Sequence, residues 1–213
     1  MAPVTVFVDY DGTITDLDTF DVLVKHVAGA AAWGSLEAQL ASGDLTLRAV
    51  LERQAAYLNI SLADADAYLK RTVRFDPAFA PFVHDCRARK IPVTVVSSGI
   101  EPLIRCALAR NGLADVPLIA NAVDPRPDGW RIRFRDSGAN GTDKARLVRA
   151  AHAGGSRTVF IGDGHSDFDA ALAADDRFAK RGRALERFLT GRRIAFTPFA
   201  SFAEITISEV PGR

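Results

Sequence analysis

The sequence predicts an α/β protein, a doubly wound parallel sheet with a small α-helical domain inserted into it. Three observations support this prediction. Residues 4–8 are all β-branched or aromatic, which is typical of a strand buried on both faces. From residue 77 onward, strand-like runs alternate with helix-like stretches, as in parallel sheets. Between the first two strands, residues 16–75 follow a helical pattern, with apolar residues at three- and four-residue steps.

The elements follow from β-branched runs, apolar periodicity and capping residues. We expect strands at residues 4–8, 92–96, 117–121, 157–161, 178–179 and 194–196, and a hairpin at 122–135 around an Asp-Gly turn. We expect core helices at residues 77–89, 101–111, 140–153 and 168–174, and one ending near residue 190. Within the insertion, Ser61 and Asp64 are typical of a helix start. The expected domains are therefore a core (1–15 and 76–213) and a helical cap (16–75).

The composition is that of an ordinary globular protein. The 27 Lys and Arg residues nearly balance the 26 Asp and Glu residues, and a net charge of +1 gives no electrostatic reason to expect nucleic acid or a membrane as partner. We see no signal peptide and no apolar run approaching the ~20 residues of a membrane span. Cys86 and Cys106 are expected to be buried free thiols in a reducing compartment. We therefore expect a cytoplasmic protein, monomeric or homodimeric.

Two carboxylates follow the first strand directly. Asp9 and Asp11 come after the buried run 4–8, where open α/β sheets place their ligands. Repulsion and desolvation would raise the pKa of one of them unless a cation neutralises the charge. Hard oxygen ligands select Mg²⁺, which also leaves room for a substrate phosphate. The pair therefore predicts a Mg²⁺ site.

Other expected strand ends and one helix start supply further polar groups. Ser97 follows the second strand, Asp163 and Asp167 follow the strand at 157–161, and Lys144 lies at a helix start. Phosphoryl transfer requires a nucleophile, a cation, donors for the phosphoryl oxygens and an acid for the leaving group. The set as a whole, more than any one residue, predicts phosphoryl-transfer chemistry.

These residues resemble, in order and spacing, the four motifs of the haloacid dehalogenase superfamily. The matching segments are DYDGT at residues 9–13, Ser97 after its strand, Lys144, and GDGHSD at residues 162–167. The resemblance spans the whole chain, and residues 16–75 look like the type-one helical cap of that superfamily. It implies a Rossmann-like core and a phosphatase acting on a small phosphorylated metabolite.

The resemblance also implies catalytic roles. Asp9 would attack the phosphoryl group and form an aspartyl-phosphate, and Asp11 would protonate the leaving group and then activate water. Lys144 would hold the charge of nucleophile and phosphate together. Superfamily dehalogenases lack an acid at the position of Asp11, so its presence favours a phosphatase.

The remaining motif residues would bind metal or phosphate. Asp9, the backbone carbonyl of Asp11, and Asp163 would ligate Mg²⁺, with Asp167 beside them ordering a metal water or the motif lysine. The residues expected at the phosphate are Thr13, Ser97, Ser98, Gly99 and Lys144. Ser97 and Ser98 compete for the role of donor, and Ser97 is favoured because it follows the strand directly.

Within the superfamily, two families are similar to this chain. The cap and the fourth motif resemble those of phosphoserine phosphatases. Residues 178–187 and 196–205 resemble the end of methionine-salvage phosphatases, which act on 2-hydroxy-3-keto-5-methylthiopentenyl-1-phosphate. Two other functions stay open at this point, a phosphomutase or phosphotransferase of the same superfamily and a receiver-like signalling domain that stores a phosphoryl group.

Overall fold

The computed structural model describes residues 2–208 and contains a seven-stranded sheet in the order β4-β3-β2-β1-β5-β6-β7. All neighbouring pairs are parallel except β3 and β4, which form the expected antiparallel hairpin. The strands are β1 (Val4–Val8), β2 (Val93–Ile100), β3 (Leu118–Asp124), β4 (Arg131–Arg133), β5 (Arg157–Gly162), β6 (Asp176–Lys180) and β7 (Thr197–Phe199). The predicted parallel α/β sheet is confirmed.

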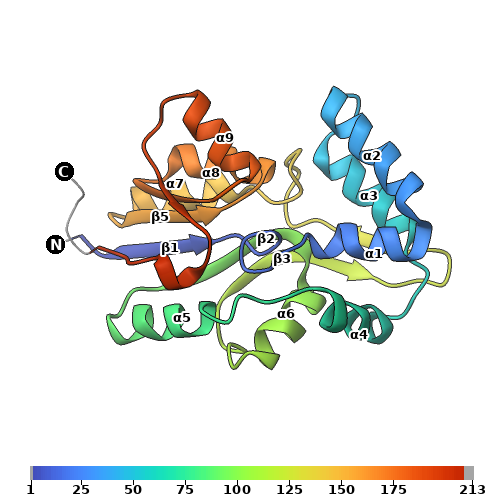
Figure 1. The fold of residues 1–213 in the computed structure, drawn as a ribbon, viewed down its shortest axis with the longest axis horizontal. Helices are drawn as coiled ribbons and strands as arrows, with labels where there is room; N and C mark the ends of the chain where they lie inside the picture. The colour runs from blue at the N-terminus through green and yellow to red at the C-terminus, as the bar shows by residue number, and fades with distance from the viewer. Residues whose placement is uncertain (1, 209–213) are drawn as a thin grey trace.

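Helices cover both faces of the sheet. Figure 1 shows α5 and α6 on one side and α7, α8 and α9 on the other. Their bounds are α5 (Phe79–Ala88), α6 (Glu101–Arg110), α7 (Lys144–Ala153), α8 (Phe168–Ala173) and α9 (Ala184–Gly191). Short 3₁₀ turns lie at His165–Asp167 and Phe202–Glu204. Within the described residues, no helix combines the length and the apolarity that a membrane crossing requires.

The segment between β1 and β2 is helical, as its apolar periodicity predicts. It contains α1 (Thr19–Ala28), α2 (Ala30–Ser42), α3 (Leu47–Tyr57) and α4 (Leu62–Thr72). Asp18 and Ser61 cap α1 and α4 by accepting backbone N–H groups of the first turn. The arrow of β1 points toward these helices in Figure 1, so they lie beyond the carboxyl end of the central strand.

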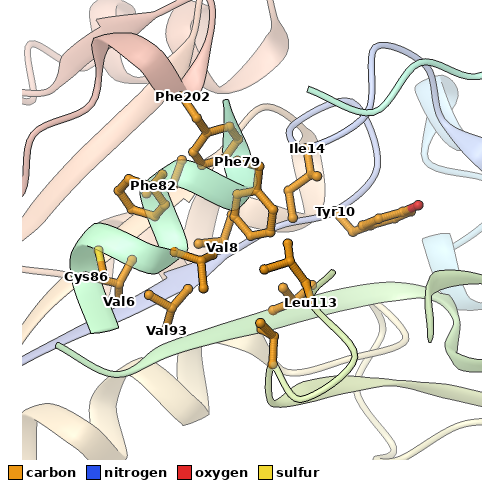
Figure 2. Close-up of a cluster of buried hydrophobic side chains, with 14 of the residues drawn as sticks. Val6, Val8, Tyr10, Ile14, Phe79, Phe82, Cys86, Val93, Leu113 and Phe202 are labelled. Atoms are coloured by element: carbon orange, nitrogen blue, oxygen red, sulfur yellow. The ribbon is translucent and has the colours of Figure 1, made fainter. Parts of the chain in front are cut away.

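The central strand β1 is buried on both faces. Val6 and Val8 are fully buried, and Figure 2 shows them packed among side chains of α5 and the segment that follows β7, such as Phe79 and Phe202. Phe7 points the other way, into a cluster with residues of α7, α8 and α9. β1 lies between β2 and β5. This position places β1, and therefore the residues that follow it, at the middle of the sheet.

Four expectations about local structure are wrong. The helix expected from residue 140 begins at Lys144, because the side chain of Asp143 accepts the Arg146 N–H and caps the helix there. β2 continues to Ile100 instead of ending at residue 96, because Thr142 Oγ1 and Asn121 Nδ2 donate to the carbonyls of Ser97 and Ser98 and hold them extended. The edge strand lies at Thr197–Phe199 and not at 194–196, since the chain is still leaving α9 at residue 194. Cys106 is a free thiol as expected, but it is exposed on α6.

The inserted helices share an apolar cluster with the α/β core. Trp130, immediately before β4, is fully buried, and its Nε1 donates to the carbonyl of Ile60, between α3 and α4, at 2.8 Å. On the side of α4, the guanidinium of Arg110 pairs with Asp66 at 2.6 Å. The hairpin and α6 therefore hold the helical segment against the sheet.

We expect Trp130→Ala to lower the free energy of unfolding by about 3–5 kcal/mol, because it removes a buried indole and its hydrogen bond to the inserted helices. Urea denaturation followed by circular dichroism measures the change. Leu172→Ala is the control, because Leu172 is 41% exposed. This substitution should lower the free energy of unfolding by no more than about 0.5 kcal/mol. Equal losses in the two variants would show that Trp130 does not contribute this packing.

Candidate active site

The polar residues singled out in the sequence meet at one edge of the sheet. Asp9 and Asp11 follow β1, Ser97 lies in the end of β2, and Asp163 follows β5. Lys144 begins α7 and reaches the same place from the side. Parallel strands bring their carboxyl ends to one edge, so residues far apart in the chain become neighbours there.

Lys144 is a buried ammonium held by two carboxylates. Its Nζ lies 2.5 Å from Asp9 Oδ1 and 2.7 Å from Asp167 Oδ1, and it donates to Ser166 Oγ at 3.0 Å. Burial by itself would lower the pKa of Lys144, but the charges of Asp167 and Asp9 raise it above its ordinary value. The side chain therefore stays charged and holds the two acids in place.

One ammonium does not balance the buried negative charge. Burial, together with the charge of Asp167, raises the pKa of Asp9 well above its ordinary value even with Lys144 in contact. The same two causes raise the pKa of Asp163 to about 7. Asp9, Asp163 and Asp167 each offer a carboxylate oxygen within 4.8 Å of the others. This all-oxygen donor set fits Mg²⁺, which would relieve the repulsion.

Asp167 has both of its oxygens engaged. Oδ1 accepts from Lys144, and Oδ2 accepts the backbone N–H groups of Asp163 at 3.0 Å and Gly164 at 2.9 Å. Gly162 must lack a side chain, because a Cβ there would collide with this carboxylate. The contact with Lys144 favours the expected role of Asp167 in ordering the motif lysine, and the two backbone contacts show that Asp167 also orders the loop after β5.

Asp11 is held by the first residue of α1. Thr19 donates to Asp11 Oδ1 through its backbone N–H at 2.8 Å and its hydroxyl at 2.6 Å, and Ser97 Oγ donates to Oδ2 at 3.3 Å. Burial raises the pKa of Asp11, and the hydrogen bonds from Thr19 and Ser97 oppose that rise. A carboxyl group with a raised pKa can carry the proton that an acid catalyst must deliver.

Of the residues expected at the phosphate, the segment around Ser97 lines the cavity and Thr13 does not. Ser97, Ser98 and Gly99 line the cavity described below, and Ser98 Oγ donates to the Asn140 carbonyl at 2.7 Å. The hydroxyl of Thr13 lies underneath, 3.1 Å from Asp9 Oδ2 and 3.2 Å from Asp163 Oδ1. Thr13 is thus placed to orient the acids, whereas the segment around Ser97 reaches the open space.

Two glycines permit the close approach of the acids. Gly12 has φ +74°, and a Cβ on it would collide with the carboxylate of Asp163. A Cβ on Gly99 would lie 2.7 Å from Asp11 Oδ2. Any side chain at either position would push a carboxylate out of the site.

The site opens into a cavity of about 470 Å³. Its floor contains Asp9, Asp11 and Asp163, and its opposite wall is formed by side chains of α1, α2 and α3. Sequence reasoning missed several residues here: Ser166, Arg183, Asp21, Gln54 and Asn140. Ser166 lies within the fourth motif and Arg183 within the segment 178–187 that resembles methionine-salvage phosphatases, so these two segments could have indicated them. Asp21, Gln54 and Asn140 come from helices and a loop that carry no local signal.

The sequence model of the haloacid dehalogenase-like hydrolase family matches residues 6–172 of this chain. The chain is 33% identical over 210 residues to Pdp3-interacting factor 1 of Schizosaccharomyces pombe, with 94% of this chain and 92% of that protein covered. It is 28% identical to the polyol phosphate phosphatase PYP1 of Saccharomyces cerevisiae (98% and 93% covered). It is 30% identical to a 2-hydroxy-3-keto-5-methylthiopentenyl-1-phosphate phosphatase of Microcystis aeruginosa (94% of each).

The fold is similar to that of a solved, substrate-bound phosphoserine phosphatase. The TM-score is 0.74 at 16% identity, with 96% of this chain and 97% of that chain covered. At 16% identity, this similarity supports the fold alone.

The raised pKa of Asp163 predicts how pH acts on stability. Without metal, the folded protein keeps a proton on Asp163 up to about pH 7, while the unfolded chain releases it near 3.8. The folded state binds more protons between these values, so stability falls as pH rises through them. Mg²⁺ should offset the loss, and it should raise the melting temperature more at about pH 8 than at about pH 5.

Scanning calorimetry with and without excess Mg²⁺ measures both effects. Asp163→Asn is the comparison variant, because it removes one of the acids with a raised pKa, and it should weaken the response of the melting temperature to pH and to metal. A melting temperature that Mg²⁺ raises equally at both pH values would contradict the assignment of this cluster as the metal site.

Proposed function

Because the chain belongs to the haloacid dehalogenase-like hydrolase family, we propose that it is a Mg²⁺-dependent phosphomonoesterase that forms an aspartyl-phosphate on Asp9. The observation that carries the proposal is the placement of Asp9 on the floor of the cavity, 2.5 Å from the buried ammonium of Lys144. Such a carboxylate can attack a phosphoryl group bound in the cavity, with the repulsion between two anions reduced by the neighbouring cation.

Asp11 would act as the acid and then as the base. It lies two residues beyond the nucleophile, lines the same cavity, and is oriented by both the backbone and the hydroxyl of Thr19. In the first step it would protonate the leaving oxygen, and in the second it would take a proton from the attacking water. The presence of this acid beside Asp9 supports hydrolysis over a receiver that stores the phosphoryl group, and it is compatible with a phosphomutase.

The donors for the phosphoryl oxygens would come from the end of β2 and from α7. Ser97 Oγ accepts the Gly99 N–H at 2.9 Å and has one proton, which it can turn from Asp11 to a phosphoryl oxygen. Ser98, Gly99 and Lys144 complete the proposed phosphate-binding set. Thr13 would support it from below by orienting Asp9 and Asp163.

Mg²⁺ would be held by Asp9, Asp163 and the backbone carbonyl of Asp11, with Asp167 beside them. When bound, it would neutralise charge on the nucleophile and on the transferring phosphoryl group. The chain's own contribution is to fix these oxygens, through the contacts of Asp167 with Lys144 and with the loop after β5.

We further propose that residues 16–75 form a cap domain over a core of residues 1–15 and 76–213. The cavity supports this division, because its floor comes from the sheet and its opposite wall from α1, α2 and α3. A cap in this position would exclude water while the phosphoryl group is transferred. The expected setting is the cytoplasm, with the enzyme acting as a monomer or homodimer.

The substrate would be a small phosphorylated metabolite. The relatives include phosphatases named for a polyol phosphate and for the methionine-salvage intermediate, and the fold is similar to that of a phosphoserine phosphatase. A methionine-salvage-like or phosphoserine-phosphatase-like activity is therefore the starting point for a substrate screen.

We expect Asp9→Asn to reduce phosphate release from p-nitrophenyl phosphate at least about 1000-fold, because the amide cannot act as the nucleophile. The control is Asp169→Asn, which makes the same chemical change at an exposed position in the first turn of α8. It should retain the wild-type rate. Turnover by Asp9→Asn near that of the control would rule out Asp9 as the nucleophile.

We expect Asp11→Asn to trap the phosphorylated enzyme when it is given the same aryl phosphate. This leaving group needs no proton, so Asp9 can still be phosphorylated, but the water that should remove the phosphoryl group has lost its base. Intact mass spectrometry and peptide mapping should find one added phosphoryl group on Asp9. Rapid turnover without this adduct would remove Asp11 from the second step.

A further inference from the structure

The wall of the cavity that faces the catalytic acids is built by the inserted helices. If the phosphoryl group binds at the floor, as the proposed function requires, the rest of the substrate must lie against this wall. Its polar residues are Asp21 in α1, Glu37 in α2 and Gln54 in α3, with Asp18 and Thr46 at the N-caps of α1 and α3. The chemistry of these side chains therefore decides which leaving groups fit.

Asp21 and Gln54 form a pair that joins α1 to α3. Gln54 Nε2 donates to Asp21 Oδ1 at 3.0 Å, and Gln54 is only 2% exposed. One of the two Nε2 protons of Gln54 is donated to Asp21, and this bond leaves the carbonyl oxygen of Gln54 and the second carboxylate oxygen of Asp21 as acceptors. Hydrogen-bond acceptors of this kind bind hydroxyl or ammonium groups and give no partner to a carboxylate.

The charge of the wall points the same way. Among the described residues that line the cavity, Arg183 is the one with a permanent positive charge, and its Nη2 donates to the Asp16 carbonyl at 2.7 Å. Its charge acts on Asp163 at the floor, where it helps to lower the pKa of that acid against the effect of burial. Lys25 lies outside the lining, stacked over the Trp33 ring at 3.4 Å. An anionic leaving group would thus meet acids at the wall.

Apolar side chains fill the space around these oxygens. The lining includes five of them from the inserted helices: Phe20, Leu40, Leu47, Val50 and Leu51. They would contact a short carbon skeleton, while Asp21 and Gln54 would receive its hydroxyl groups. The cavity of about 470 Å³ is large enough for a small metabolite.

We propose that Asp21 and Gln54 determine specificity by binding the hydroxyl groups of an uncharged, polyol-like leaving group, and that the wall rejects leaving groups that carry a carboxylate. This rests on the proposed function, since it assigns the part of the substrate that remains after phosphoryl transfer. The proposed specificity differs from that of enzymes whose substrates carry a carboxylate beside the phosphoester, such as O-phosphoserine.

Glycerol 3-phosphate and 3-phosphoglycerate form a matched pair of substrates, because the second differs from the first only in having a carboxylate in place of a terminal hydroxymethyl group. With the full chain and Mg²⁺, kcat/KM should be at least about 100-fold higher for glycerol 3-phosphate. Phosphoethanolamine, which carries an ammonium group, and p-nitrophenyl phosphate, which has neither group, complete the panel. A preference for phosphoethanolamine over glycerol 3-phosphate would overturn the assignment to hydroxyl groups.

Asp21→Asn removes the acid that is paired with Gln54 and keeps the shape of the wall, so it should reduce the preference for glycerol 3-phosphate over 3-phosphoglycerate at least about tenfold. Glu52→Gln, a change of the same size on the exposed side of α3, should leave the preference as in the wild type. Gln54→Arg should raise kcat/KM for 3-phosphoglycerate by adding a cation. Because each ratio is taken within one variant, a general loss of stability does not imitate the effect.

The outcomes separate this proposal from the proposed function. Hydrolysis of p-nitrophenyl phosphate with equal kcat/KM for the matched pair would overturn the assignment of the wall and leave the phosphatase intact. An unchanged preference in Asp21→Asn would overturn the role of that residue. Absence of phosphate release from every compound would overturn the phosphatase assignment, and this proposal with it.

Discussion

The contact between the Lys144 ammonium and the carboxylates of Asp9 and Asp167 is the interaction on which the site depends. Three further features surround it: a third carboxylate from Asp163, burial from water, and a cavity above. Burying several negative charges near one positive charge is unfavourable, and the raised pKa values of Asp9 and Asp163 express that cost. The same imbalance makes the site receptive to a divalent cation and, through that cation, to a phosphate.

The fold holds these carboxylates close together despite their repulsion. β1 lies in the middle of the sheet and is buried on both faces, so the residues after it have little freedom to move the acids apart. Gly12 and Gly162 remove the side chains that would separate the carboxylates. Asp167 then ties the loop after β5 to α7 through hydrogen bonds from two backbone amides and from the ammonium.

Much of this could be predicted from the sequence, because the informative signals are local. The buried run of β1, the two acids after it, and the motif around Asp163 each lie within a few residues, and the parallel topology explains why they meet. The wall residues could not be predicted, since Asp21 and Gln54 are 33 positions apart and only packing of α1 on α3 joins them. The full extent of β2 was missed for a related reason, because hydrogen bonds from distant Asn121 and Thr142 keep its last residues extended.

A crystal structure of the protein with Mg²⁺ and beryllofluoride, a mimic of the phosphoryl group on an aspartate, would test the central claim most directly. The account predicts the mimic attached to an oxygen of Asp9 and a Mg²⁺ ion bonded to Asp9 and Asp163 at about 2.1 Å, with Lys144 still in contact with Asp9. An adduct on another residue, or a metal bound away from these carboxylates, would contradict it.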